Sequence, residues 1–339
     1  MRVAIVHDDL VQWGGAERVL QGICEIYPDA PIYTSVFDRD NESLSKPFGS
    51  KKIVTSFLQK IPGWRSVYKA LLPLYGVAFE QFDFSDFDLV ISNTTRFAKA
   101  IITKPQTLHL CYCHTPPRFL WHFSSAGQNF GLAEILMSKL RIYDQVSARR
   151  VDLFLAGSEN VRARIKKVYR MDSKVVYPFI DLERFKDIES FDGSYFVVIG
   201  RPNKYKRFDL AEAACKEVGM PLKVINGSLN DDLVVQVLAG CKALIIPGIE
   251  DFGLTSLEVQ ALGKPVIAFK YGGVLETVIE GKTGLFFNEQ TVKSLKDILL
   301  RFNALNHFKS EDCINNAKKF SKEKFVKNFK QTIDSLLYN

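Results

Sequence analysis

Residues 243–262 of this chain read ALIIPGIEDFGLTSLEVQAL, and this stretch decides the fold. The apolar run at its start is typical of a buried strand, the glycines at 248 and 253 indicate a turn, and helical spacing follows. Glu250 stands in the turn, and Glu258 follows eight positions later on the expected helix. A strand that passes through a glycine turn into a helix places these side chains at the carboxyl end of a parallel sheet, where α/β proteins bind ligands.

The same alternation of strand-like runs and amphipathic helices extends along the whole chain and predicts parallel sheets with helices on both faces. In the first half we expect strands at 2–6, 32–35, 89–92, 108–113 and 153–156, with helices at 16–25, 63–75, 132–151 and 159–169. In the second half we expect strands at 196–199, 222–226, 243–247, 265–269 and 284–287, with helices at 209–218, 233–241, 255–262 and 274–279.

Two domains fit the length of the chain, because 339 residues with 47% apolar side chains can build two cores. We expect one Rossmann-like domain over residues 1–185 and a second over residues 186–320, joined by a linker at 186–194. The helix at about 320–339 is expected to pack back on the first domain. Two such halves predict a ligand cleft between them.

Composition excludes several classes of protein. No run of about 18 apolar residues predicts a membrane span, and the N-terminus lacks the pattern of a signal peptide, so we expect a cytoplasmic protein. The six cysteines lack the spacing of a zinc site, and we expect Cys111 and Cys113 to be buried, reduced thiols on one face of a strand. The net charge is +7, but no nucleic-acid-binding motif accompanies it.

Part of the positive charge gathers in residues 51–72, where basic side chains alternate with apolar ones. The basic residues are Lys51, Lys52, Lys60, Arg65 and Lys69. Two interpretations stay open: contact with an anionic membrane surface, or a solvated helix face whose other side lies in the core.

Two further glycine turns follow expected strands. Gly14 and Gly15 follow the first strand and would let the backbone approach a ligand closely, although a plain tight turn is the alternative. Gly200 opens the second turn and is followed by Arg201 and Lys206, and such a density of cations indicates an anionic ligand. Arg201 can hold a phosphate with two hydrogen bonds, while Lys206 supplies a point charge.

The turn at 247–254 offers complementary groups. Glu250 is expected to point toward a ligand from the loop, and Glu258 to accept two hydroxyls of a ribose. Between them, the backbone amides of Phe252, Gly253 and Leu254 are expected to face a diphosphate, because a helix N-terminus binds anions.

Together these motifs resemble those of the family-four retaining glycosyltransferases of the GT-B fold, and most nearly the bacterial mannosyltransferases that build O-antigen and similar polysaccharides. The resemblance runs nearly end to end, and its most specific motif is the E-x₇-E pair of Glu250 and Glu258. Other matching motifs are HDDL and GGAERVL within 7–20, CYCHTPPR at 111–118, GRPNKYKRFDL at 200–210 and GKPVIAFKYGGVLETV at 263–278.

The resemblance implies a role for each matching residue. The catalytic set would be His114, Arg201, Lys206 and Glu250. Glu250 and His114 would contact the donor sugar, and Glu258 the ribose. Arg201 and Lys206 would neutralise the leaving diphosphate, the loop of Gly14 and Gly15 would close over the phosphates, and Arg118 would assist with the acceptor or a phosphate.

The function implied is retaining, metal-independent transfer of a hexose, first mannose from GDP-mannose, without a cofactor. The implied acceptor is a glycan, expected to be lipid-linked, in lipopolysaccharide or another cell-surface polysaccharide, with the enzyme peripheral at the inner face of the membrane. A transferase that uses ADP- or UDP-glucose is one alternative. The other is a catalytically impaired sugar-nucleotide-binding or scaffold subunit, because the second domain is unusually short at 226–233, where relatives place a helix and a strand near the nucleotide base.

Overall fold

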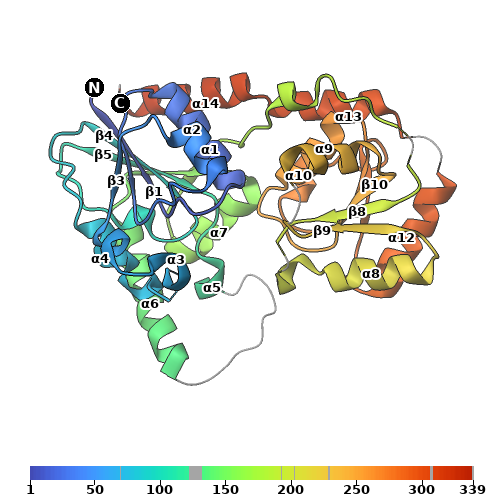
Figure 1. Ribbon diagram of the computed structural model, residues 1–339, viewed down its shortest axis with the longest axis horizontal. Coiled ribbons are helices and arrows are strands. Elements are labelled where there is room, and N and C mark those ends of the chain that lie inside the picture. Colours follow the sequence, from blue (N-terminus) through green and yellow to red (C-terminus); the bar gives the residue numbers. More distant parts are fainter. Residues whose placement is uncertain are drawn as a thin grey trace. The chain divides into compact units, whose positions relative to one another are not determined.

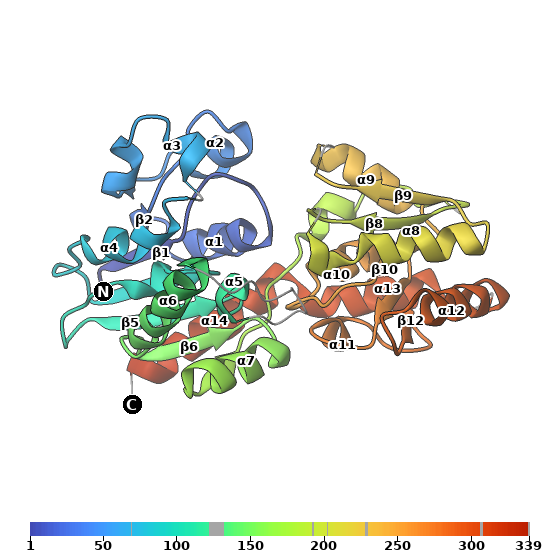
Figure 2. The same ribbon diagram turned by 90° about the horizontal axis from the view of Figure 1, so that it is seen from below.

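The computed structural model describes residues 1–68, 70–121, 132–191, 193–201, 203–227, 230–305 and 308–337. They belong to two α/β units, which are drawn from two directions in Figures 1 and 2. The first unit contains Met1–Phe123, Gly127–Val176 and Asn328–Asn339, and Tyr177–Lys327 belong to the second.

A parallel sheet of seven strands, in the order β3-β2-β1-β4-β5-β6-β7, forms the centre of the described first unit. β1 lies between β2 and β4, so that Ile5 pairs with Ile32 on one side and with Ile91 on the other. The strands are β1 (Val3–His7), β2 (Ile32–Thr34), β3 (Ile53–Thr55), β4 (Leu89–Thr94), β5 (Leu108–Cys113), β6 (Leu153–Ala156) and β7 (Ser173–Val175).

Helices cover both faces of this sheet, with α1 and α14 on one side and α6 and α7 on the other (Figure 1). Cys111 and Cys113 point to the core beneath α6 and α7, whereas Tyr112 lies 6.4 Å, ring to ring, from Phe329 of α14. The helices and 3₁₀ turns are α1 (Gly15–Ile26), α2 (Glu42–Phe48), η1 (Phe57–Lys60), α3 (Trp64–Val67), η2 (Leu72–Leu74), α4 (Tyr75–Glu80), η3 (Ala98–Ala100), α5 (Arg118–Trp121), α6 (Leu132–Ala148) and α7 (Glu159–Tyr169).

The single helix predicted at 63–75 was wrong. The described residues of this stretch form two short turns, α3 and η2, because Pro73 has no backbone N–H and its ring clashes with a continuing helix. The strands β3 and β7 and the helix α2 were not predicted, because three-residue strands and a seven-residue helix leave too little periodicity to detect.

The second unit has a parallel sheet in the order β12-β11-β10-β8-β9. Alternate residues of its strands face opposite cores: Val197 and Leu244 pack under α9 and α10, while Val198 and Ile245 pack under α8 and α12. Its elements are η4 (Leu182–Phe185), β8 (Phe196–Ile199), η5 (Lys204–Lys206), α8 (Phe208–Glu217), β9 (Leu222–Ile225), α9 (Asp231–Ala239), β10 (Ala243–Ile246), α10 (Leu254–Ala261), β11 (Val266–Phe269), α11 (Val274–Thr277), β12 (Gly284–Phe287), α12 (Val292–Ala304), α13 (Ser310–Ala317) and η6 (Lys318–Phe320). The last helix, α14 (Lys322–Leu337), begins in the second unit, and its residues from Asn328 onward belong to the first.

The structure bears on two expectations from composition, one for the cysteines and one for membrane-spanning helices. All six cysteines are buried and free, which confirms the prediction of buried thiols for Cys111 and Cys113. In the part of the chain that the structure describes, no helix combines the length and the apolar composition needed to cross a bilayer.

Candidate active site

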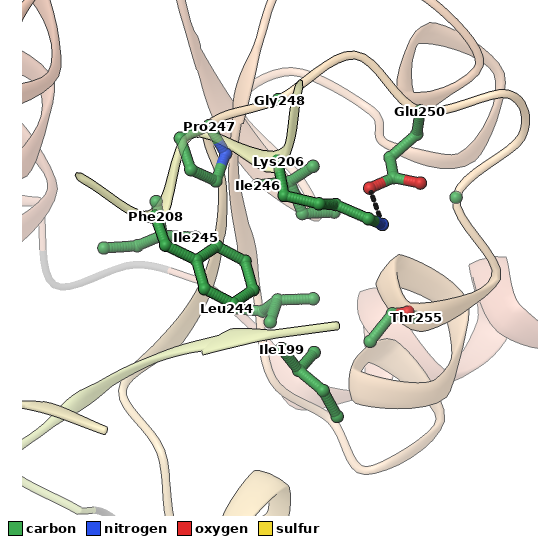
Figure 3. A pocket seen from close by; sticks show the side chains of 11 residues that line it. Ile199, Lys206, Phe208, Leu244, Ile245, Ile246, Pro247, Gly248, Glu250 and Thr255 are labelled. Carbon is green, nitrogen blue, oxygen red and sulfur yellow. Dashed lines mark hydrogen bonds and ion pairs between the residues drawn. The ribbon is translucent and has the colours of Figure 1, made fainter. Parts of the chain in front are cut away.

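The most concentrated chemistry of the second unit lies where β8 and β10 end. Lys206 and Glu250 form an ion pair there, with Nζ 2.6 Å from Oε1, and both side chains line a small pocket (Figure 3). Their side chains are 17% and 20% exposed, so a ligand can still reach them. Burial alone would lower the pKa of Lys206, but the carboxylate of Glu250 outweighs this and raises it. Lys206 therefore stays cationic at neutral pH.

Glycines bring the two charged residues together. Gly200 has φ +143°, and a Cβ there would lie only 3.3 Å from Cε of Lys206. A Cβ on Gly248 would lie 2.3 Å from the carbonyl oxygen of Tyr205, so a side chain at 248 would push η5 away. These positions need glycine because the Lys206 turn packs directly on the backbone that leads to Glu250.

The loop that carries Glu250 is fixed by the turn before α11. The backbone N–H of Gly273 donates to the carbonyl oxygen of Glu250 at 2.9 Å. A Cβ on Gly272, where φ is +86°, would lie 2.6 Å from the same oxygen. The glycine pair in the motif at 263–278 therefore holds this loop in place.

α10 begins at the same edge of the sheet. Gly253 precedes it in the left-handed conformation, with φ +100° and no side-chain cap, so the first backbone N–H groups of α10 have no capping side chain. Leu254 is the first helical residue, whereas the Phe252 ring is buried and stacks on Tyr177 at 5.6 Å. The backbone of 252–254, and not the Phe252 side chain, is thus available for an anion.

Buried hydrogen bonds anchor α10 from behind. The Ser256 hydroxyl donates to the Gly253 carbonyl at 2.7 Å and lies 2.6 Å from the Thr277 hydroxyl. The Gln260 side chain donates to the Thr277 carbonyl at 2.8 Å, and the Asn316 amide donates to the Gln260 side-chain oxygen at 2.8 Å. These contacts join α10, α11 and α13 and fix the direction in which the helix N-terminus points.

Glu258 lies on α10 with its side chain 12% exposed, and Arg184 is its cationic neighbour. Arg184 Nη1 lies 3.6 Å from Glu258 Oε1, and Nη2 lies 3.1 Å from Asp231 Oδ2 at the start of α9. Arg184 was not predicted as a site residue, because nothing in its local pattern distinguishes it from a surface arginine. The structure shows that it ties the short connection before α9 to the expected ribose-binding residue.

Arg201 is more exposed to solvent than Lys206 and Glu250. Its side chain is exposed at the end of β8, while its carbonyl oxygen accepts from the Asn203 N–H at 2.8 Å. Lys204 is also exposed, and Arg207 pairs with Asp209 at 3.1 Å.

In the first unit, the predicted residues lie in the segments that follow β1 and β5. Gly14 precedes α1 with an extended backbone, and Gly15 is its first residue. His114 follows β5, half-buried, and Arg118 begins α5, also half-buried.

His114 belongs to a chain of polar side chains. Its Nε2 lies 2.7 Å from Oδ1 of Asn93, and Nδ2 of Asn93 donates to the Ala16 carbonyl at 2.9 Å. Nδ1 of His7 lies 3.0 Å from Nδ2 of Asn93, and Nε2 of His7 lies 3.4 Å from Glu17 Oε1. Asn93 was not predicted as a site residue, although a polar residue at the end of a buried strand was an available signal.

Asp8 lies at the same edge of the sheet, and its carboxylate is saturated with hydrogen bonds. Its two oxygens accept from the backbone N–H groups of residues 95–98 at 2.6–2.9 Å and from the Thr94 hydroxyl at 2.8 Å. Burial would raise the pKa of Asp8, but the positive charge of Arg96 and these hydrogen bonds outweigh it and lower the pKa. Asp9, also buried, forms an ion pair with Arg96.

Two pairs of aspartates have the spacing of a divalent-cation site, but they contact arginines and a backbone N–H group. The chain has two Asp-x-Asp triplets, at 38–40 and 86–88. Asp38 and Asp40 form ion pairs with Arg65 at 2.9 and 2.5 Å, and Asp88 accepts from the backbone N–H of Arg2 at 2.6 Å. Among the described residues, no group of three His, Cys, Asp or Glu side chains is placed to hold a metal ion. The expectation of a metal-independent donor site therefore depends on the cations of the second unit.

Comparisons with known proteins agree with the fold and with the motifs. The family described as Glycosyltransferase Family 4 matches residues 13–184, and the family described as Glycosyl transferases group 1 matches residues 173–320. The alpha-1,3/1,6-mannosyltransferase ALG2 of Dictyostelium discoideum is 41% identical over 92 residues, which are 26% of this chain and 21% of that protein. The chain spans from about a fifth to about half of the length of the curated relatives it matches first.

Two solved structures align over nearly the whole chain. Anabaena HepE in complex with UDP has a TM-score of 0.70 at 16% identity, covering 99% of this chain and 100% of that one. Sucrose-phosphate synthase from Thermosynechococcus elongatus has a TM-score of 0.77 at 14% identity, with full coverage of both chains. At such identities the likeness concerns the fold, and it confirms the predicted GT-B class with two Rossmann-like domains.

Proposed function

Because the chain belongs to glycosyltransferase family 4, we propose that it is a retaining glycosyltransferase that moves a hexose from a nucleotide diphosphate donor to a glycan acceptor. The observation that carries the proposal is the Lys206–Glu250 ion pair beside the uncapped start of α10. Cations, open backbone amides and a hydroxyl-binding carboxylate then meet at one sheet edge, which is the set of groups that a sugar diphosphate requires.

The transition state explains why these groups would accelerate transfer. As the bond between sugar and phosphate breaks, negative charge develops on the leaving diphosphate, and a fixed cation stabilises it more in the transition state than in the ground state. Lys206 supplies that charge, aided by Arg201 and by the amides of 252–254. Glu250 holds hydroxyls of the sugar and orients Lys206.

Retention follows in this proposal from attack on the face that the leaving group occupies. The departing diphosphate takes the proton of the acceptor hydroxyl, so no protein carboxylate acts as a nucleophile. Glu250 and Glu258 then bind hydroxyls of the sugar and the ribose, and the two-carboxylate mechanism of glycosidases does not apply. His114 contacts the donor sugar, Gly14 and Gly15 bring backbone near the phosphates, and Arg118 serves the acceptor or a phosphate.

For the donor, we favour GDP-mannose, with UDP- or ADP-glucose as the rival. The name of the Dictyostelium relative supports a mannosyl donor, whereas the complex of Anabaena HepE with UDP supports a uridine nucleotide. The test is calorimetric titration with GDP, UDP and ADP in the presence of EDTA. Selective binding of one diphosphate without metal would support the proposal and identify the donor class.

A scaffold or sugar-nucleotide-binding subunit is the second candidate, and the short connection between β9 and α9 favours it. β9 ends at Ile225 and α9 begins at Asp231, so little chain remains there to surround a base. Failure to bind any of the three diphosphates would favour this candidate over an active transferase.

The acceptor is proposed to be lipid-linked, in the synthesis of a cell-surface polysaccharide such as an O-antigen, with the protein bound at the inner face of the membrane. Exposed apolar side chains on α3, η2 and α4 support a membrane contact: Val67, Leu74 and Val77 are 40%, 41% and 57% exposed. Trp64, in contrast, is buried, and Arg65 is paired with two aspartates. Lys69 of the basic stretch lies outside the described residues.

Flotation with vesicles that contain an anionic phospholipid tests this contact. We expect the wild type to float with anionic vesicles and not with neutral ones, and the triple variant Lys60→Glu, Arg65→Glu, Lys69→Glu to remain at the bottom. Equal flotation of the triple variant would remove the basis for an electrostatic membrane contact.

A further inference from the structure

The Asn93 side chain lies between two elements to which the proposed function assigns donor contacts. We propose that Asn93 is a positioning residue for His114: its amide oxygen fixes the imidazole in one orientation and keeps the ring hydrogen on Nε2. The inference rests on the proposed function, in which His114 contacts the donor sugar.

The orientation of the Asn93 amide follows from the partner on its other end. Nδ2 lies 2.9 Å from the carbonyl oxygen of Ala16, which can only accept a hydrogen bond. The NH₂ group must therefore face Ala16. Turning the amide over would place two acceptors against each other inside a fully buried site, since Asn93 is 0% exposed.

The tautomer of His114 follows from that orientation. With NH₂ directed at Ala16, the amide oxygen Oδ1 is the atom 2.7 Å from His114 Nε2. A carbonyl oxygen accepts and cannot donate, so Nε2 carries a hydrogen, and when the ring is neutral this is the Nε2–H tautomer.

The surroundings hold both partners firmly. Asn93 ends the pairing of β4 with β1 opposite His7, whose Nδ1 lies 3.0 Å from the Asn93 carbonyl oxygen. The Tyr112 ring contacts the His114 ring with centroids 5.1 Å apart. A ring held by a hydrogen bond and by packing against an aromatic neighbour loses little freedom when a substrate binds, which favours catalysis.

The same amide also joins the two proposed donor contacts of the first unit. Ala16 directly follows Gly14 and Gly15 at the start of α1. One side chain therefore sets the position of the glycine turn through Nδ2 and that of His114 through Oδ1. Loss of Asn93 should affect His114 and the turn together.

The first test is a spectroscopic one on the intact protein. The chain has five histidines, so ¹⁵N-labelled imidazoles give few signals, and His114→Gln assigns that of His114. We expect long-range ¹H–¹⁵N correlations to show His114 with a protonated Nε2. A neutral ring with its hydrogen on Nδ1, or a rapid average of the two tautomers in the wild type, would overturn the proposal.

Two substitutions separate the acceptor role from simple packing. Asn93→Ala removes the oxygen and should give a mixture of tautomers. Asn93→Asp retains an oxygen facing His114 and should keep Nε2 protonated, at a cost in stability because its second oxygen faces the Ala16 carbonyl. If neither variant folds, the wild-type spectrum still decides between the two tautomers. An unchanged tautomer in Asn93→Ala would contradict the inference.

The second test asks whether the two residues act as one in sugar transfer. Asn93→Ala should lower kcat by about 10-fold, the cost of a lost buried hydrogen bond, with a smaller change in KM. Combined with His114→Ala, it should cause a smaller further loss than it causes in the wild type, because only its effect through the glycine turn remains. Ser92→Ala is the matched control, since Ser92 lies on the same strand and bonds His109 at 2.8 Å instead of His114.

The outcomes distinguish this inference from the proposed function. A wild-type protein that neither binds a nucleotide nor transfers sugar would contradict the proposed function, while the imidazole spectrum would still judge the contact between Asn93 and His114. Additive losses in the double variant of an active enzyme would overturn the positioning role and leave the transferase proposal standing.

Discussion

The two units present opposite kinds of polar chemistry at the carboxyl ends of their strands. In the first unit, Asp8 and Asn93 are fully or almost fully buried, and their oxygens and nitrogens are engaged by backbone and side-chain partners. In the second unit, Lys206, Glu250 and Arg184 are partly exposed and form ion pairs.

The difference shows how each edge can serve a ligand. Buried, saturated hydrogen bonds fix positions but leave little to exchange, because breaking them costs the desolvation of every partner. Ion pairs that solvent still reaches can be exchanged for phosphate oxygens and sugar hydroxyls, because the ligand offers each charged group a new partner. We infer that the first edge holds groups in place, whereas the second edge exchanges its internal contacts for the donor.

Asp8→Asn should have the largest effect and should act on stability. An amide NH₂ would face the N–H donors that Asp8 now accepts from, so we expect the free energy of unfolding to fall by at least about 3 kcal/mol. All three tryptophans, at 13, 64 and 121, lie in the first unit, so urea unfolding followed by tryptophan fluorescence reports on this unit.

Asp172→Asn is the control for that substitution, because the Asp172 side chain is 92% exposed and pairs only at the surface with Lys166. It should change the unfolding free energy by less than about 0.5 kcal/mol. Equal effects of the two substitutions on the unfolding free energy would mean that the buried hydrogen bonds of Asp8 stabilise the first unit no more than a surface ion pair does.

Lys206→Ala and Glu250→Ala should have the next largest effect, this time on turnover. Each removes a group proposed to act in the transition state, so we expect kcat to fall at least about 100-fold in a transfer assay. Lys204→Ala is the matched control, since Lys204 begins the same 3₁₀ turn with an exposed side chain. Near-normal turnover of Lys206→Ala would contradict the proposed exchange of this ion pair.

His7 should give the first unit a pH dependence of stability. Burial would lower the pKa of His7, but the hydrogen bond and charge of Glu17 outweigh it and raise the pKa above 6.5. A raised pKa in the folded state stabilises the protein fully below about pH 6.5, and this contribution disappears as the pH rises through the folded pKa.

We therefore expect the unfolding free energy of the wild type to decrease as the pH rises above about 6.5 and through the raised pKa of His7. Glu17→Gln removes the charge that raises the pKa of His7 and should flatten this part of the profile. The same slope in both proteins would show that His7 does not take up a proton on folding.

Arg184→Ala should have the smallest effect, on nucleotide affinity. Arg184 orients Glu258 through a part-exposed ion pair, so we expect the dissociation constant of the preferred nucleoside diphosphate to rise by about 2- to 5-fold. Lys186→Ala is the control, because Lys186 forms only an exposed pair with Glu183. An unchanged dissociation constant would show that Glu258 needs no cation to hold its position.

Much of the fold was predictable because it depends on local patterns. The strands at 108–113, 153–156, 196–199 and 284–287 were predicted to the residue, since each is a short apolar run bounded by polar residues or turns. The stretch at 63–75 was not, because its apolar residues suggested a helix whereas Pro73 interrupts the backbone hydrogen bonds.

Single residues of the candidate site could be predicted from the sequence, but the contacts between them could not. Glycines, cations and glutamates at strand ends indicated Lys206 and Glu250 separately, and the structure shows them as one ion pair across 44 positions. Asn93 offers only the weak signal of a polar residue at the end of a buried strand, and Arg184 has no distinctive local pattern. Their importance comes from His114 and Glu258, which lie far from them in the sequence.

The sequence by itself determined two alternating α/β halves, the glycine turns at the strand ends and the kinds of side chain that stand there. Only the tertiary structure decided which of these groups are saturated and which remain open to a ligand. The reason is that periodicity is a property of neighbouring residues, whereas a hydrogen bond needs two atoms about 3 Å apart. For Asp8 and its partners around residue 95, that distance exists only because β1 lies beside β4 in the sheet.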